Sequence, residues 1–128
     1  MITAEEPTPE WVQRLGPAPM IYSREINYWL LRAAIDILRN RPDIGCLYVH
    51  TTDYAMHMWP PEAHESKEHL ARMDDLLGQA AQIAPDAAFL ITADHGMNAK
   101  TRCWDLEKVC AARKFLCEKP FPPGAIAM

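Results

Sequence analysis

Two short apolar runs separate three amphipathic segments along this chain, and this alternation is the feature that most limits how the chain can fold. Apolar residues recur at spacings of three and four over residues 23–40 and 66–84, which predicts helices that each bury one face. Residues 44–49 and 87–92 are almost continuously apolar, as in strands that are covered on both faces. A third helix is expected to begin after a cap at Asp105. The order helix–strand–helix–strand–helix favours parallel strands with crossover helices, so the sequence predicts an α/β layered sandwich with a mostly parallel sheet.

The chain of 128 residues has the length of one compact domain. Several prolines and a lack of periodicity predict an irregular lead-in over residues 1–22. Three prolines and a glycine predict an irregular tail over residues 114–128, which leaves residues 23–113 as the α/β part of the chain. The last three of the four cysteines are spaced seven residues apart, which favours a shared buried helix face over a soft-metal site.

The composition argues against several functional classes. The formal net charge of -4 argues against a nucleic-acid-binding protein, which would need a basic face. No apolar run reaches the roughly 18 residues of a membrane-spanning helix. The amino terminus lacks the basic and then apolar segments of a signal peptide. We therefore expect a cytoplasmic protein that has neither a nucleic acid nor a membrane as its partner.

Each apolar run is followed by a carboxylate and an imidazole. Asp53 and His57 are four residues apart after the first run, and Asp94 and His95 are adjacent after the second. Parallel strands end at the same edge of a sheet, so these four side chains are expected to converge. Carboxylate and imidazole together suit zinc, manganese or iron. Either pair alone could instead be a helix cap, a turn or a chance neighbour, but two pairs at one edge favour a metal site.

Two stretches of the sequence resemble metal-binding segments of the alkaline phosphatase superfamily. They are "YVHTTDYAMH" at residues 48–57 and "ITADHGMNAK" at residues 91–100, and the resemblance is closer to the phosphodiesterase and nucleotide-pyrophosphatase branch. Within that branch, "TTDY" with a histidine four residues after its aspartate, together with "TADHGMNAK", is most similar to phosphonoacetate hydrolase. The likeness covers about residues 20–112 and includes the segment "IYSREINYWLLRAAIDIL", which resembles the helix that precedes the first strand.

The resemblance implies an alkaline-phosphatase-like fold, here incomplete, and a metal-dependent hydrolase. It implies two divalent cations, commonly zinc, with manganese or iron as alternatives. Asp53 and His57 match two ligands of one cation, and Asp94 and His95 match two ligands of the other. The expected substrate is a small phosphonate or phosphate ester. Phosphonoacetate, hydrolysed to acetate and phosphate, is the first choice, and phosphodiesters or nucleotides are the second.

Some parts of the family pattern have no counterpart that we can identify in this sequence. The family's nucleophilic threonine and a further aspartate ligand cannot be placed, and no histidine follows His95 to supply its last ligand. The sequence therefore predicts part of a catalytic domain that is inactive on its own, with a truncated non-catalytic relative as the alternative. The two apolar runs have the composition of strands from the middle of a larger sheet, so we also expect the chain to self-associate through exposed sheet edges. Asn98 and Lys100 could contact substrate, although a solvated loop role is favoured.

Overall fold

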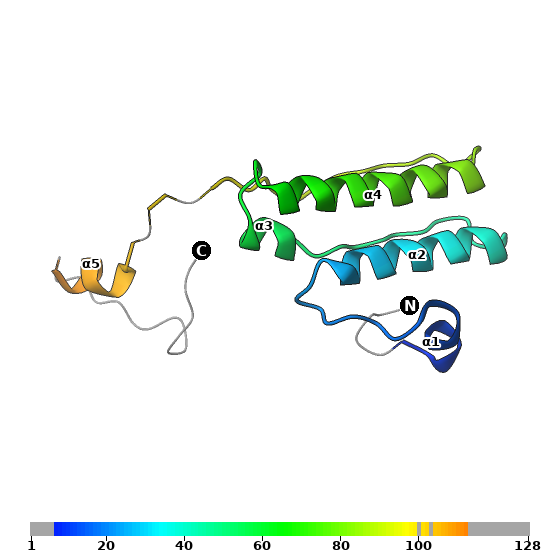
Figure 1. Cartoon of the computed structure of the whole chain (residues 1–128), viewed down its shortest axis with the longest axis horizontal. Helices are drawn as coiled ribbons and strands as arrows, with labels where there is room; N and C mark the ends of the chain where they lie inside the picture. Colours follow the sequence, from blue (N-terminus) through cyan, green and yellow to red (C-terminus); the bar gives the residue numbers. More distant parts are fainter. Residues whose placement is uncertain (1–6, 100, 103, 113–128) are drawn as a thin grey trace.

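The computed structural model describes residues 7–99, 101–102 and 104–112. Within these residues the chain forms five helices and no strand. The helices are α1 (Pro9–Leu15), α2 (Glu25–Asn40), α3 (Tyr54–Met58), α4 (His64–Ile83) and α5 (Leu106–Ala112). The long helices α2 and α4 lie side by side and run in the same direction, and an extended segment follows each of them and returns along it (Figure 1).

The three predicted helices are confirmed as α2, α4 and α5, and local chemistry explains where they begin and end. Ser23 lies just before α2, and its Oγ accepts a hydrogen bond of 3.3 Å from the backbone N–H of Ile26. This bond satisfies one of the free N–H groups at the start of a helix. The helix ends before Pro42, whose ring cannot continue it. Asp105 caps α5 in the same way, because its Oδ1 accepts a 3.1 Å bond from the N–H of Lys108.

The predicted parallel sheet, and with it the alkaline-phosphatase-like layered sandwich, is wrong for the described residues. Residues 44–49 and 87–92 contain no strand, and no backbone hydrogen bond joins the two runs. Each run instead begins with a local turn. The N–H of Ile44 bonds to the carbonyl of Arg41 at 3.2 Å, and the N–H of Ala87 bonds to the carbonyl of Ala84 at 3.1 Å. Strands exist through the hydrogen bonds between neighbours, so an extended run without such a neighbour stays irregular.

The exposure of the apolar side chains shows what these runs lack. Tyr48 is 83% exposed, and Leu90 and Ile91 are 91% and 72% exposed, whereas the sequence predicted strands that are covered on both faces. Leu47 and Val49 of the first run are half-buried, and Val49 packs against the core between α2 and α4. The hydrophobic pattern of a segment indicates which of its faces can be buried. Burial itself requires another segment of the chain to pack over that face.

Helix α2 forms the centre of the described structure, because α4 covers one side of it and α1 covers another. Four buried side chains form the contact between α2 and α4, namely Leu31, Ile35, Leu76 and Ala80. On the side of α1, the fully buried Trp29 donates a 3.1 Å hydrogen bond from Nε1 to the carbonyl of Gly16. Gly16 has a φ of 80°, which glycine adopts without steric cost, so the chain can turn directly after α1.

Two further expectations concern the ends of the chain. Helix α1 occupies part of the lead-in at residues 1–22, where no regular element was expected. It starts at Pro9, whose fixed φ suits the first position of a helix, and it stops at Gly16. The predicted tail at residues 114–128 lies outside the described residues, as do Cys103, Cys117 and Lys100. No helix in the described part of the chain is long and apolar enough to span a membrane.

Candidate metal-ligand site

The first carboxylate–imidazole pair is built by the short helix α3. Asp53 lies immediately before this helix, and its carbonyl accepts hydrogen bonds from the N–H groups of Met56 (2.9 Å) and His57 (3.3 Å). His57 is therefore one turn further along, on the same face as Asp53. Its Nε2 lies 2.9 Å from Asp53 Oδ2, and both side chains are partly open to solvent. The four-residue spacing, one turn of helix, thus places the two groups in contact.

Two buried polar side chains hold the chain on either side of α3. Asn27, in α2, is completely buried and exchanges hydrogen bonds with the backbone of Thr52, the residue before Asp53. Ser66, in α4, donates from Oγ to the carbonyl of Pro60, two residues after the end of α3, at 2.9 Å. The position of the Asp53–His57 pair is therefore set by both long helices. Sequence analysis did not identify Asn27 or Ser66, because these bonds join residues far apart in the chain.

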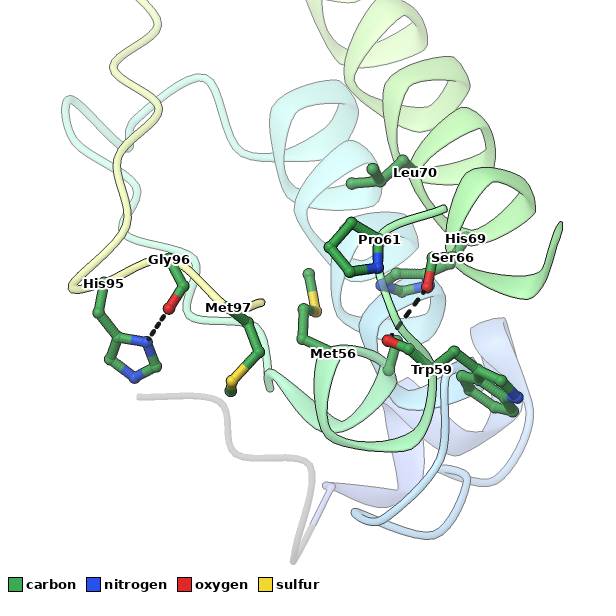
Figure 2. A pocket seen from close by; sticks show the side chains of 10 residues that line it. Met56, Trp59, Pro61, Ser66, His69, Leu70, His95, Gly96 and Met97 are labelled. Carbon is green, nitrogen blue, oxygen red and sulfur yellow. Dashed lines mark hydrogen bonds between the residues drawn. The ribbon is translucent and has the colours of Figure 1, made fainter. Parts of the chain in front are cut away.

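The second pair lies on an extended segment rather than a helix. Asp94 Oδ1 accepts a 3.0 Å hydrogen bond from the backbone N–H of His95, and its Oδ2 lies 3.8 Å from His95 Nε2. His95 Nδ1 lies 3.0 Å from the carbonyl of Gly96 (Figure 2). A carbonyl can only accept, so Nδ1 carries the proton and Nε2 of the neutral ring keeps its lone pair. Backbone hydrogen bonding of this kind orients histidines that bind metal through the other nitrogen.

The segment that carries the second pair approaches α3 across two hollows. One hollow, of about 250 Å³, has Met56 and Trp59 on one side and the run His95–Met97 on the other (Figure 2). The second, of about 290 Å³, is lined by His57 together with Asn98 and Ala99. One histidine of each pair thus borders a hollow, His95 the first and His57 the second, whereas Asp53 and Asp94 line neither. The two pairs do not form one cluster, since the described residues contain no group of three or more potential metal ligands.

Asp53, His57, Asp94 and His95 were expected to converge at a sheet edge, and that sheet does not form in the described residues. No group of three or more potential ligands is present in the described part of the chain, so the structure shows the two pairs separately. The two segments instead border neighbouring hollows, which residues 95–97 and residues 98–99 line from the side of the second pair.

The donor atoms of the first pair fit a divalent cation. Zinc bonds to nitrogen and oxygen are about 2.0–2.2 Å long, so a tetrahedral ion needs donors roughly 3.4 Å apart. The separation of 2.9 Å between His57 Nε2 and Asp53 Oδ2 needs only a small carboxylate rotation to reach that value. Without a cation, the His57 proton lies between the two atoms, and a cation would displace it. Each pair therefore offers one carboxylate and one imidazole as potential donors.

His69, in α4, is a buried histidine that belongs to neither pair. It is 1% exposed, and its Nδ1 lies 2.9 Å from the hydroxyl of Tyr28. Burial lowers the pKa of the imidazole below its ordinary value, and the positive charge of Arg24 lowers it further. The helical spacing from His69 to Met73, Leu76 and Ala80 was the signal that places it on the buried face.

Comparison with known proteins identifies the family of the chain. The family model for type I phosphodiesterase / nucleotide pyrophosphatase matches residues 5–119, a span that includes both carboxylate–imidazole pairs. No solved structure matched the chain. The family match agrees with the branch that the two motifs indicated, and it covers most of the sequence. The chain therefore belongs to the type I phosphodiesterase / nucleotide pyrophosphatase family, which is a class of phosphoester hydrolases.

Proposed function

We propose that this chain provides metal ligands of a metal-dependent phosphoester hydrolase. Asp53 and His57 hold one divalent cation, and Asp94 and His95 contribute to a second. The observation that supports this most directly is the contact between His57 Nε2 and Asp53 Oδ2, in a segment that the family match covers. Such cations neutralise phosphoryl oxygens and lower the pKa of a bound nucleophile.

The roles of the chain's own residues follow from their hydrogen bonds. Asp53 acts as an ionised ligand, and its carbonyl also starts α3, so ligand position and helix start are fixed together. His57 presents Nε2 toward Asp53 from the next turn. His95 is oriented by its bond to the Gly96 carbonyl, which leaves Nε2 available. Zinc is the first choice of ion for this donor set, and manganese or iron are the alternatives.

Metal titration of the 128-residue chain tests this proposal. We expect cobalt(II), used as a coloured substitute for zinc, to bind with an absorption band that reports its coordination. Changing His57→Ala should weaken binding by at least about tenfold, because one direct ligand is lost. His64→Ala is the matched control, since His64 is an exposed histidine at the start of α4 and belongs to neither pair. Equal affinity for the wild type and the His57→Ala chain would contradict the assignment.

Phosphonoacetate is our first choice of substrate, and its support is the likeness of the two motifs to phosphonoacetate hydrolase. The described lining of the two hollows includes no lysine or arginine that could bind the substrate carboxylate. A phosphodiester or nucleotide is the alternative within the same family. Phosphorus NMR with the cobalt-loaded chain separates the two, because a ligand phosphorus near the ion relaxes faster. Faster relaxation of bis(nitrophenyl) phosphate than of phosphonoacetate would favour the alternative.

Turnover is a separate question from metal binding. We propose that the 128-residue chain alone hydrolyses neither substrate at a useful rate, because no nucleophilic threonine can be assigned in it. The assay is release of phosphate or nitrophenol with zinc or manganese added. Robust turnover that disappears in the His57→Ala chain would show that a nucleophile is present and has been missed.

A further inference from the structure

Asn27 makes two hydrogen bonds to the backbone of a residue that lies 25 positions away in the sequence. Its Nδ2 donates a 2.9 Å hydrogen bond to the carbonyl of Thr52, and its Oδ1 accepts a 2.8 Å bond from the Thr52 N–H. The Thr52 hydroxyl also lies within 3.3 Å of the same Oδ1. One side chain therefore satisfies both backbone groups of the residue that precedes Asp53. This arrangement resembles one rung of a sheet ladder, supplied by a helix.

Asn27 lies at a buried position of α2 where an apolar side chain would be the ordinary choice. It is 0% exposed and lies beside Ile26, which is 1% exposed, and near Trp29, which is 0% exposed. An amide in such a place costs free energy unless its hydrogen bonds are made. A leucine has the same branching and number of side-chain heavy atoms and would need no hydrogen bonds in α2. The amide is useful here because it fixes one particular stretch of backbone.

Helix α3 depends on such fixing, because it has only five residues. Isolated helices of this length are not stable in water, since the cost of forming the first turn is not recovered. The bonds from Met56 and His57 to the Asp53 carbonyl therefore need support from outside the helix. Asn27 supplies it before α3, and Ser66 supplies it after α3 through its bond to the Pro60 carbonyl.

We propose that Asn27 is a positioning residue, which fixes Thr52 so that Asp53 and His57 are held together before a cation binds. The proposal rests on the proposed function for its purpose, but the positioning itself can be measured without metal. It predicts that loss of the Asn27 amide loosens α3 selectively, and that metal affinity falls as a consequence.

Amide hydrogen exchange of the ¹⁵N-labelled, metal-free chain tests the positioning. Asn27→Leu keeps the branching and the number of side-chain heavy atoms, and it removes both hydrogen bonds to the Thr52 backbone. We expect the Thr52 and His57 amides to exchange at least about tenfold faster than in the wild type. The control is Leu76→Ala, which weakens the contact between α2 and α4 without touching Thr52. Exchange in Asn27→Leu should also be at least about tenfold faster than in the Leu76→Ala control. Thr52→Val removes only the hydroxyl contact and should change exchange less than Asn27→Leu does, because the two backbone hydrogen bonds remain.

Cobalt(II) titration of the same chains adds the second readout. Asn27→Leu should bind cobalt at least about tenfold more weakly than Leu76→Ala, within the range for residues that orient metal ligands. If Asn27→Leu does not fold, Asn27→Ala replaces it. The smaller apolar side chain also removes both hydrogen bonds to the Thr52 backbone, so the same effects relative to Leu76→Ala are expected in both measurements.

The outcomes separate the positioning from the proposed function. If the wild-type chain binds no cobalt through His57, the metal-site proposal fails, while the exchange data still decide whether Asn27 holds α3. If the wild type binds cobalt but Asn27→Leu matches Leu76→Ala in both exchange and affinity, the positioning inference is overturned and the metal site stands. Faster exchange with unchanged cobalt affinity would overturn the claim that the pair must be held in advance.

Discussion

Acidification should destabilise this chain through His69. The folded structure buries its imidazole almost completely, and burial followed by the charge of Arg24 lowers the pKa of the folded state below 6.5. Glu25 opposes this in part. In the unfolded chain the same group titrates near 6.5. As pH falls below that value, the unfolded chain takes up a proton that the folded chain does not, so the free energy of unfolding decreases.

The size of the effect follows from one proton. The free energy of unfolding changes by at most about 1.4 kcal/mol per pH unit for each proton of difference between the two states. The stabilisation is present above the unfolded-state pKa, and it is lost as pH falls toward the lowered pKa of the folded state. Below both values the loss is complete and the slope from His69 returns to zero. A protonated ring has no acceptor nitrogen, so in that form His69 Nδ1 could only donate to the Tyr28 hydroxyl oxygen.

Urea unfolding followed by tryptophan fluorescence measures this, repeated from about pH 7.5 to about pH 5 so that the His69 window is crossed. The His69→Phe chain keeps a ring of similar shape but cannot titrate. Its free energy of unfolding should therefore change less steeply with pH than that of the wild type, by up to about 1.4 kcal/mol per pH unit. His64→Ala, which removes an exposed histidine of the same helix, should leave the wild-type slope within the error of the measurement.

Comparison of slopes removes effects that do not depend on pH. Losing the partner of the Tyr28 hydroxyl shifts the His69→Phe curve as a whole and does not alter its slope. Parallel curves for the wild type and His69→Phe would refute the reasoning, because they would mean that the folded state binds the His69 proton as readily as the unfolded state. A steeper curve for His69→Phe would refute it as well.

Predictions for the stability of four further variants follow from packing and backbone conformation. Leu76→Ala should lower the free energy of unfolding by about 2–5 kcal/mol, because Leu76 is 2% exposed, whereas Leu70→Ala at an exposed site of α4 should cost far less. Gly78→Ala should stabilise the chain by roughly 0.5–1 kcal/mol, since Gly78 lies within α4 and no atom lies within 4 Å of an added Cβ. Gly16→Ala should destabilise it by about 1 kcal/mol, because a φ of 80° is strained for alanine. Urea unfolding checks all four, and a Gly16→Ala chain as stable as Gly78→Ala would contradict the backbone argument.

Local features of this protein could be predicted from its sequence because they depend on residues within a few positions of each other. The periodicity of α2 and α4, the cap at Ser23 and the stop before Pro42 all act over one or two turns. The contact between Asp53 and His57 is local in the same sense, since four residues make one turn of helix. The motifs around the two pairs also identified the family branch that the family match supports.

The tertiary structure alone decided what depends on partners distant in sequence. The apolar runs have the composition of buried strands, but a strand needs hydrogen-bonded neighbours, and within the described residues Leu90 and Ile91 have neither these nor cover. The sequence shows only that Asn27 lies in a helix. Its role depends on the folded chain, which places Thr52, 25 positions away, against its amide. His69 is buried because α2 packs on α4 and Tyr28 meets its ring. Hydrogen bonding and burial require two surfaces, and a sequence pattern describes only one of them.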